Sequence, residues 1–163
     1  MTVTQNLLMV KINVPKQKLS LVSGDRVLRS WSVSTSQYGV GCNNGSNKTP
    51  LGLHRIVSKI GRNIPEGGVF RRRRFTGEIA KIFRKPRVKR VDQITTRILR
   101  LEGMEEGRNQ GEGVDTYKRC VYIHGTPEEW RIGKPASHGC IRMKNKDIIE
   151  LFSLIKRGTL VRI

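Results

Sequence analysis

Apolar residues alternate with polar residues near the start of the chain, and this alternation constrains the fold more than any other feature of the sequence. Val10, Ile12 and Val14 are separated by Lys11 and Asn13. Successive side chains of a β-strand point to opposite faces, so a period of two predicts a strand with one buried face. A chain that begins in this way is expected to build its core on a sheet.

Clusters of Gly, Pro, Asn, Asp and Ser divide the rest of the chain into short segments, which is typical of a mainly β domain. The predicted strands cover residues 18–22, 26–34, 51–60, 97–101, 120–124 and 159–163. The stretch 39–50, rich in Gly, Asn and Ser, predicts a loop that borders a cleft. One amphipathic helix is predicted near the end of the chain, with Asn145 as its N-cap and Gly158 beyond its last turn.

The segment from about residue 61 to 92 lacks clear periodicity and is rich in arginine, with basic clusters at 71–74 and 84–90. This composition predicts an excursion from the sheet. Two interpretations of the excursion are open. It is a basic flap over the functional site, or it is a solvated insertion that keeps the protein soluble.

The whole chain is strongly basic, since 32 Lys and Arg residues outnumber 13 Asp and Glu residues and give a formal net charge of +19. Such a surface predicts an anionic partner, and nucleic acid, anionic lipid headgroups and the bacterial cell wall all satisfy this condition. Aromatic residues make up 6% of the chain, and no array of them accompanies the basic clusters for stacking on bases. A nucleic-acid-binding module is therefore a distant alternative, and no nucleic acid partner is expected.

The residues with the clearest chemistry are His124-Gly125 and the run Ser-His-Gly-Cys-Ile-Arg-Met at 137–143. A cysteine is nucleophilic as thiolate, which a nearby imidazole or a set of backbone N–H groups favours. Gly125 and Gly139 each adjoin a reactive residue, where glycine lets the backbone turn sharply and approach a ligand. The pattern predicts that Cys140 is a nucleophile and that His124 is its base.

Two other interpretations of these residues are open. A tetrahedral zinc ion accepts two thiols and two imidazoles, although the spacing here is unlike that of the usual zinc fingers. The donor set would be Cys120, His124, His138 and Cys140. Alternatively, the histidines only satisfy backbone carbonyls. Cys120 alone, in an apolar strand, is predicted to be a small buried hydrophobe.

The His-Gly pair followed by Ser-His-Gly-Cys-Ile-Arg-Met resembles the signature of the L,D-transpeptidase catalytic domain, the YkuD-type family of cysteine enzymes that cross-link bacterial peptidoglycan. Thr49–Ile56 is similar to the family's Thr-Pro-x-Gly segment, and Thr96–Leu101 resembles the strand that leads to its active site. The resemblance is weakest in the arginine-rich segment. It implies one catalytic domain over residues 1–163, with a mainly β, β-sandwich-like fold and a short helix after the nucleophile.

The resemblance also implies a reaction. Cys140 attacks the carbonyl between the third and fourth residues of a donor tetrapeptide stem, D-alanine leaves, and the acyl group passes from the thioester to an amine acceptor. His124 acts as the base and later as the acid, and the Gly125 carbonyl orients it. Backbone N–H groups near His138, Gly139 and Cys140 are the expected oxyanion donors.

Arg142 and Ser137 are the expected substrate-binding residues, with a salt bridge that closes the loop as the other role open to Arg142. The resemblance implies no metal or cofactor, and it implies carbapenems as inhibitors. The expected partners are peptidoglycan stem peptides and the anionic cell-wall polymer. If water replaces the acceptor amine, the same chemistry makes an L,D-carboxypeptidase. The resemblance implies a location in the cell envelope, in the periplasm or cell wall. The apolar run Leu7–Val10 is too short for the hydrophobic region of an export signal, so no signal peptide is visible in the sequence.

Overall fold

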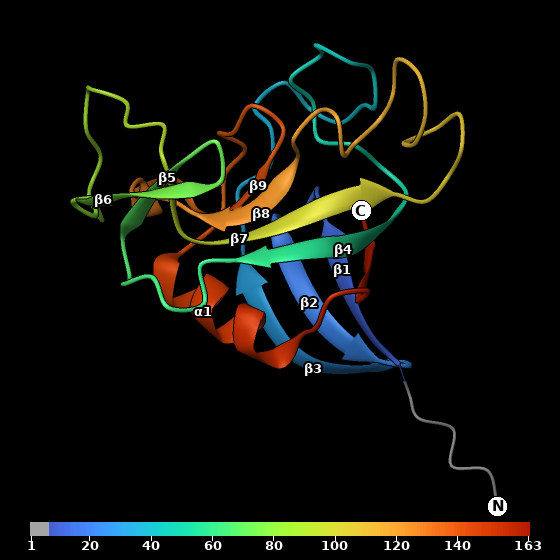
Figure 1. The fold of residues 1–163 in the computed structure, drawn as a ribbon, viewed down its shortest axis with the longest axis horizontal. Coiled ribbons are helices and arrows are strands. Elements are labelled where there is room, and N and C mark those ends of the chain that lie inside the picture. Colours follow the sequence, from blue (N-terminus) through green and yellow to red (C-terminus); the bar gives the residue numbers. More distant parts are fainter. Residues whose placement is uncertain (1–6) are drawn as a thin grey trace, which may run out of the picture.

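The structure, a computed structural model, describes residues 7–163 and consists mostly of strands (Figure 1). The strands are β1 (Leu8–Asn13), β2 (Lys18–Ser23), β3 (Arg26–Ser32), β4 (Leu53–Ile60), β5 (Gly68–Arg71), β6 (Arg74–Ile79), β7 (Ile94–Gly103), β8 (Tyr122–Gly125), β9 (Ile141–Met143) and β10 (Leu160–Arg162). A short 3-10 helix, η1 (Glu129–Arg131), follows β8, and the helix α1 (Asn145–Leu154) follows β9. Within residues 7–163, no helix is long and apolar enough to cross a membrane.

The strands pair into one sheet in which β7 is a branch point. The main order is β3-β2-β1-β10-β4-β7-β5-β6, while β8 also pairs with β7 and carries β9 on its other edge. The antiparallel meander of β1, β2 and β3 confirms the prediction, with Val10 and Ile12 buried and Lys11 and Asn13 exposed. Two pairs are parallel, namely β1 with β10 and β8 with β9. β10 also pairs with β4 and thereby joins the meander to the rest of the sheet.

Apolar side chains lie on both faces of the sheet where β7 and β8 pair. Leu99 and Ile123 point into the main core, which α1 covers by packing against β7 and β8. Ile98 and Tyr122, one residue earlier in each strand, join Phe70 in a second, smaller cluster. This alternation produces two packed layers on one pair of strands. It confirms the sandwich-like, mainly β fold with one helix that the sequence predicts.

The arginine-rich segment is only partly an excursion from the sheet, so that prediction is wrong for its first half. β5 and β6 form a hairpin, and β5 pairs with β7 through Val69 and Phe70. Both side chains are buried. The apolar run is short, and it is followed by the arginines at 71–74 and by a strand, β6, in which every residue is exposed. The charged surroundings therefore conceal the strand from an analysis of periodicity.

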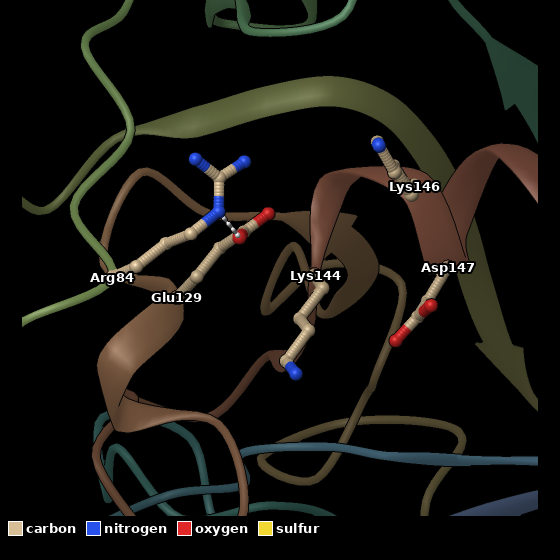
Figure 2. A pocket seen from close by; sticks show the side chains of 5 residues that line it. All are labelled: Arg84, Glu129, Lys144, Lys146 and Asp147. Atoms are coloured by element: carbon tan, nitrogen blue, oxygen red, sulfur yellow. Dashed lines mark ion pairs between the residues drawn. The ribbon is translucent and has the colours of Figure 1, made fainter.

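The helix α1 begins one position earlier than predicted, because its N-cap is Lys144 and Asn145 is its first residue. The backbone N–H and the side-chain Nδ2 of Asn145 both donate to Oε1 of Glu129, each at 2.9 Å. A carboxylate from η1 thus takes the place of a local cap at the start of the helix. Oε2 of Glu129 pairs with Arg84 at 3.3 Å, which ties the second half of the basic segment to α1 (Figure 2).

Candidate active site

The parallel pairing of β8 with β9 brings the predicted base and nucleophile to one face of the sheet. In its register, Ile123 lies opposite Ile141, and both are buried in the main core. His124 lies opposite Arg142 and points to the other face, because side chains alternate along a strand. Cys140, directly before β9, packs against the second apolar cluster on that same face. His124 and Cys140 are therefore presented by neighbouring strands.

The sulfur of Cys140 lies among backbone groups at the start of β8. It accepts a hydrogen bond from the Tyr122 N–H at 3.3 Å, and its thiol donates to the Cys120 carbonyl at 3.6 Å. Burial of the sulfur raises the pKa of Cys140 to about 11, although the Tyr122 N–H acts in the opposite direction. At neutral pH the residue is therefore a thiol, and it needs a base before it can attack.

His124 is 3% exposed, and burial lowers the pKa of its imidazole to about 4. The ring is neutral at pH 7. Its Nδ1 lies 2.6 Å from the Gly125 carbonyl oxygen, which can only accept, so Nδ1 carries the ring proton and Nε2 carries the lone pair. A Cβ on Gly125 would lie 2.6 Å from the Thr95 carbonyl oxygen, and this crowding requires glycine beside His124.

The turn before Cys140 is fixed by short polar contacts. The Ser137 hydroxyl donates to the Cys140 carbonyl at 2.5 Å and accepts from the Gly139 N–H at 3.3 Å. Gly139 has a φ of +125°, which glycine adopts without strain, and its carbonyl accepts from Thr49 at 3.0 Å. Within residues 7–163, the backbone N–H groups of His138 and Cys140 have no protein acceptor.

Arg142 shares the face of Cys140 as predicted, yet its guanidinium is 3% exposed. It pairs with Asp92 at 2.5 Å and with Glu128 at 3.6 Å. Asp92 also pairs with Nδ1 of His138 at 3.3 Å. This burial favours the loop-closing salt bridge over direct contact of Arg142 with a substrate carboxylate. Asp92 ends the arginine-rich segment, which therefore reaches the site through one acidic residue.

A cleft of about 290 Å³ opens beside Cys140. Three segments line it, and their residues are Asn44, Gly45 and Asn47, then Lys118, Arg119, Cys120 and Val121, and finally His138, Gly139 and Cys140. The loop 39–50 thus borders the cleft as the sequence predicts. Arg119 holds this loop by donating to the carbonyls of Gly41 at 3.3 Å and Lys48 at 2.6 Å.

Cys120 lies in a turn before β8, so the predictions of a strand from residue 120 and of a buried thiol are wrong. Its φ is +57°, and its side chain is exposed at the cleft. The turn is closed by the Cys120 N–H, which donates to the Tyr117 carbonyl at 3.1 Å. In the part of the chain that the structure describes, no three His, Cys, Asp or Glu side chains are placed to hold a metal ion. The four donors of the zinc alternative are therefore not gathered into a ligand set.

Three residues at the site were not predicted from the sequence. Asp92 bridges Arg142 and His138, Arg119 holds the loop at the cleft, and Arg73 donates to the Tyr122 hydroxyl at 2.9 Å. Arg73 and Arg119 are concealed among many other basic residues. Asp92 carried a usable signal, because it is an isolated acid two residues after the last arginine of a basic cluster.

Comparison with known proteins agrees with this arrangement. The family described as YkuD, L,D-transpeptidase catalytic domain, matches residues 9–163. A protein of Bacillus subtilis (strain 168) that carries the L,D-transpeptidase name YkuD is 58% identical over 61 residues, which make up 34% of this chain and 37% of that protein. The matched part thus spans well under two thirds of the length of this relative.

Solved structures share the fold at low sequence identity. An L,D-transpeptidase from Xylanimonas cellulosilytica DSM 15894 superposes with a TM-score of 0.58 at 18% identity, covering 98% of this chain and 61% of that one. The L,D-transpeptidase LdtMt1, solved in complex with imipenem, superposes with a TM-score of 0.55 at 16% identity, covering 95% and 57%. These likenesses establish the fold, and the family match extends over nearly the whole sequence. The chain therefore belongs to the L,D-transpeptidase catalytic-domain family.

Proposed function

We propose that the chain is a peptidoglycan L,D-transpeptidase that works through a thioester on Cys140. One observation carries the proposal. A neutral imidazole with its Nε2 lone pair available and a thiol at an open cleft lie on one face of the parallel β8–β9 pair. Nucleophilic catalysis by cysteine needs a base that a third group orients, and this placement supports that role for His124. Here the third group is the Gly125 carbonyl.

The first half of the reaction forms the thioester. When the donor stem enters the cleft, Nε2 of His124 takes the thiol proton, and Cys140 attacks the carbonyl between the third and fourth stem residues. The N–H groups of His138 and Cys140, which have no acceptor within residues 7–163, donate to the oxyanion. The imidazolium then gives its proton to the leaving amine, and D-alanine departs.

The second half transfers the acyl group. An acceptor amine enters, loses a proton to His124 and attacks the thioester, and Cys140 recovers its proton as the new amide forms. Thioesters react more readily with amines than with water, so an acceptor held at the cleft is expected to prevail. Water at the same position would instead produce a free tripeptide, which is the carboxypeptidase alternative.

Basic side chains at the rim of the cleft are the proposed recognition elements for stem carboxylates. Arg142 is buried in its own ion pairs, whereas Lys118 is exposed and lines the cleft, and Arg73 donates to the hydroxyl of Tyr122, whose N–H contacts the Cys140 sulfur. A lysine or arginine at a rim attracts a carboxylate as a charge-assisted partner. Ser137 serves the turn rather than the substrate, because its hydroxyl is occupied by Cys140 and Gly139.

The net charge of +19 supports binding to the anionic cell-wall polymer and a location in the envelope. The arginines at 71–74 surround the β5–β6 turn and are largely exposed. Binding of the protein to wall sacculi should therefore weaken as the salt concentration rises, because screening shortens the range of these charges. Equal binding at low and high salt would contradict this part of the proposal.

One assay tests the proposed reaction. The protein is incubated with a disaccharide-tetrapeptide, with and without an added D-amino acid as acceptor, and the products are identified by mass. Exchange of the terminal residue, or a cross-linked dimer, is expected. Free tripeptide as the sole product in the presence of the acceptor would identify an L,D-carboxypeptidase instead. Imipenem should add its mass to the wild-type protein and leave Cys140→Ala unmodified.

A further inference from the structure

Two thiols share the cleft. The Cys140 thiol lies 3.6 Å from the Cys120 carbonyl oxygen, and both residues line the same opening. Cys120 is exposed, and all three cysteines in the chain are free. Cys42 differs because it is partly buried and its thiol donates to the Leu51 carbonyl at 3.7 Å. The proposed reaction uses Cys140 and leaves Cys120 without a role.

The surroundings of Cys120 suit a thiol that meets oxidants. Nη1 of Arg73 lies 4.0 Å from its sulfur, so a guanidinium is placed to stabilise negative charge there. Oxidation selects thiols that are both exposed and close to a cation. Cys140 is the poorer first target, because burial keeps its sulfur protonated.

We propose that Cys120 is a peroxide-reactive thiol that forms a reversible disulfide with Cys140 and so switches off the nucleophile. The effect on activity rests on the proposed function of Cys140, whereas the disulfide itself does not. The oxidant is a peroxide, which the cell envelope meets from outside. The reductant that restores the site is a dithiol.

The chemistry balances in two steps. The Cys120 thiolate attacks hydrogen peroxide, the O–O bond breaks, and Cys120 becomes a sulfenic acid as hydroxide leaves and is protonated to water. Cys140, deprotonated by His124, then attacks the sulfur of Cys120. The S–O bond breaks, a second water leaves, and the S–S bond forms. Peroxide is reduced by two electrons, one from each sulfur.

The backbone around Cys120 permits the approach that a disulfide needs. A disulfide requires the two Cα atoms to come within roughly 7 Å. The Cys140 sulfur already lies 3.6 Å from the Cys120 carbonyl oxygen, so the backbones of the two residues are close at this point. Cys120 has a φ of +57°, a left-handed conformation that non-glycine residues rarely adopt, so this backbone conformation is itself strained.

Peptide mapping tests the proposal on the purified chain. The protein is treated with hydrogen peroxide, alkylated with iodoacetamide and digested without reduction. Trypsin cleaves after Arg119, Arg131 and Arg142, so the two cysteines fall in separate peptides, 120–131 and 132–142. The expected product is these two peptides joined, and dithiothreitol should release them. Transpeptidase activity should fall about tenfold or more with the linkage and return on reduction.

Two variants decide the outcome. Cys42→Ser should behave as the wild type in linkage and recovery. Cys120→Ser should form no link, and Cys140 should still be alkylated after the peroxide dose that links the wild type. Oxidation of Cys140 in Cys120→Ser at that dose, linkage of Cys42 to Cys140, or unlinked thiols in the wild type would each overturn the proposal. A protein that forms the Cys120–Cys140 disulfide but shows no transpeptidase activity even when reduced would instead overturn the proposed function.

Discussion

Two buried histidines lie on β4 and β8, two strands that pair with β7, and they differ in a single hydrogen bond. His54 in β4 is fully buried, and burial lowers its pKa to about 4, as it does for His124 in β8. Nδ1 of His54 lies 3.0 Å from the Gly52 carbonyl, and its Nε2 lies 3.0 Å from the Thr116 hydroxyl. His124 bonds through Nδ1 alone among residues 7–163.

Burial and a lowered pKa are common to both histidines, so they do not by themselves single out His124 as the proposed base. Both rings are neutral at pH 7, and both have a carbonyl that fixes the tautomer. In His54 the second nitrogen is engaged in holding two parts of the chain together. In His124 the second nitrogen, Nε2, keeps its lone pair, and the Cys140 thiol lies directly before the neighbouring strand, β9. Under the proposed function, the unengaged Nε2 of His124 is therefore the feature that separates the two rings.

The largest effect is expected when the Cys140 thiol, the proposed partner of His124, is removed. Cys140→Ala should abolish turnover and the imipenem adduct, because no thioester can form, while the melting temperature stays near that of the wild type. Cys42→Ala is the matched control and should keep full activity, since its thiol donates to the Leu51 carbonyl and Cys42 does not line the cleft. Turnover by Cys140→Ala would remove the nucleophile from the proposed mechanism.

The next effect separates the two histidines. His124→Gln should lower kcat/KM by about a hundredfold or more, the usual cost of losing a general base. His54→Gln should keep kcat within about threefold per folded molecule and lower the melting temperature, because it disturbs two buried hydrogen bonds. Kinetics and thermal unfolding of both variants make the comparison. Equal losses of kcat would mean that His54 also shapes the site.

Acid should affect the two histidines alike, since both have folded pKa values near 4 and an ordinary value of 6.5. Between these values the unfolded chain binds more protons, so the free energy of unfolding falls as the pH falls from 6.5 towards 4. Each histidine contributes a loss on the order of 3 kcal/mol across that window. Urea unfolding at pH 7 and pH 5 should show a smaller loss in His54→Gln than in the wild type. If His54→Gln lost as much unfolding free energy between pH 7 and pH 5 as the wild type, His54 would not contribute to the acid sensitivity.

The smallest effect concerns the charges around His124. Asp92 raises the pKa of His124 and Arg142 lowers it. Asp92→Asn should therefore move the acid limb of kcat to slightly lower pH, with a loss of at most several-fold in rate from the freed Arg142 and His138. Glu105→Gln is the control, because its carboxylate faces His54. If the acid limb shifted in Glu105→Gln and not in Asp92→Asn, the limb would report the titration of His54 rather than that of His124.

The parts of the fold that repeat a simple pattern were predictable. Alternation fixed the β1–β3 meander, and the order of His124, Gly125 and Cys140 predicted a base and a nucleophile on adjacent strand ends. The Gly125 carbonyl contact was likewise expected, and the structure shows it at 2.6 Å. The catalytic roles of these residues remain predictions.

The parts that depend on distant partners were not predictable. Arg142 resembles a substrate ligand in the sequence, but Asp92 and Glu128 enclose it. Cys120 belongs to an apolar run, yet the turn that closes at Tyr117 exposes it. The partners of Arg142 come from distant parts of the chain, whereas the exposure of Cys120 follows from a local turn whose positive φ its sequence does not signal.

The position of β10 has a consequence for biosynthesis. This strand lies between β1 and β4, so it joins β1 of the meander to the rest of the sheet. The ribosome makes β10 after both of its neighbours, and during that interval the facing edges of β1 and β4 have unpaired backbone groups. Such edges are open to pairing with other chains. We therefore expect nascent chains that stop before residue 159 to depend on chaperones, although they already contain the whole catalytic motif.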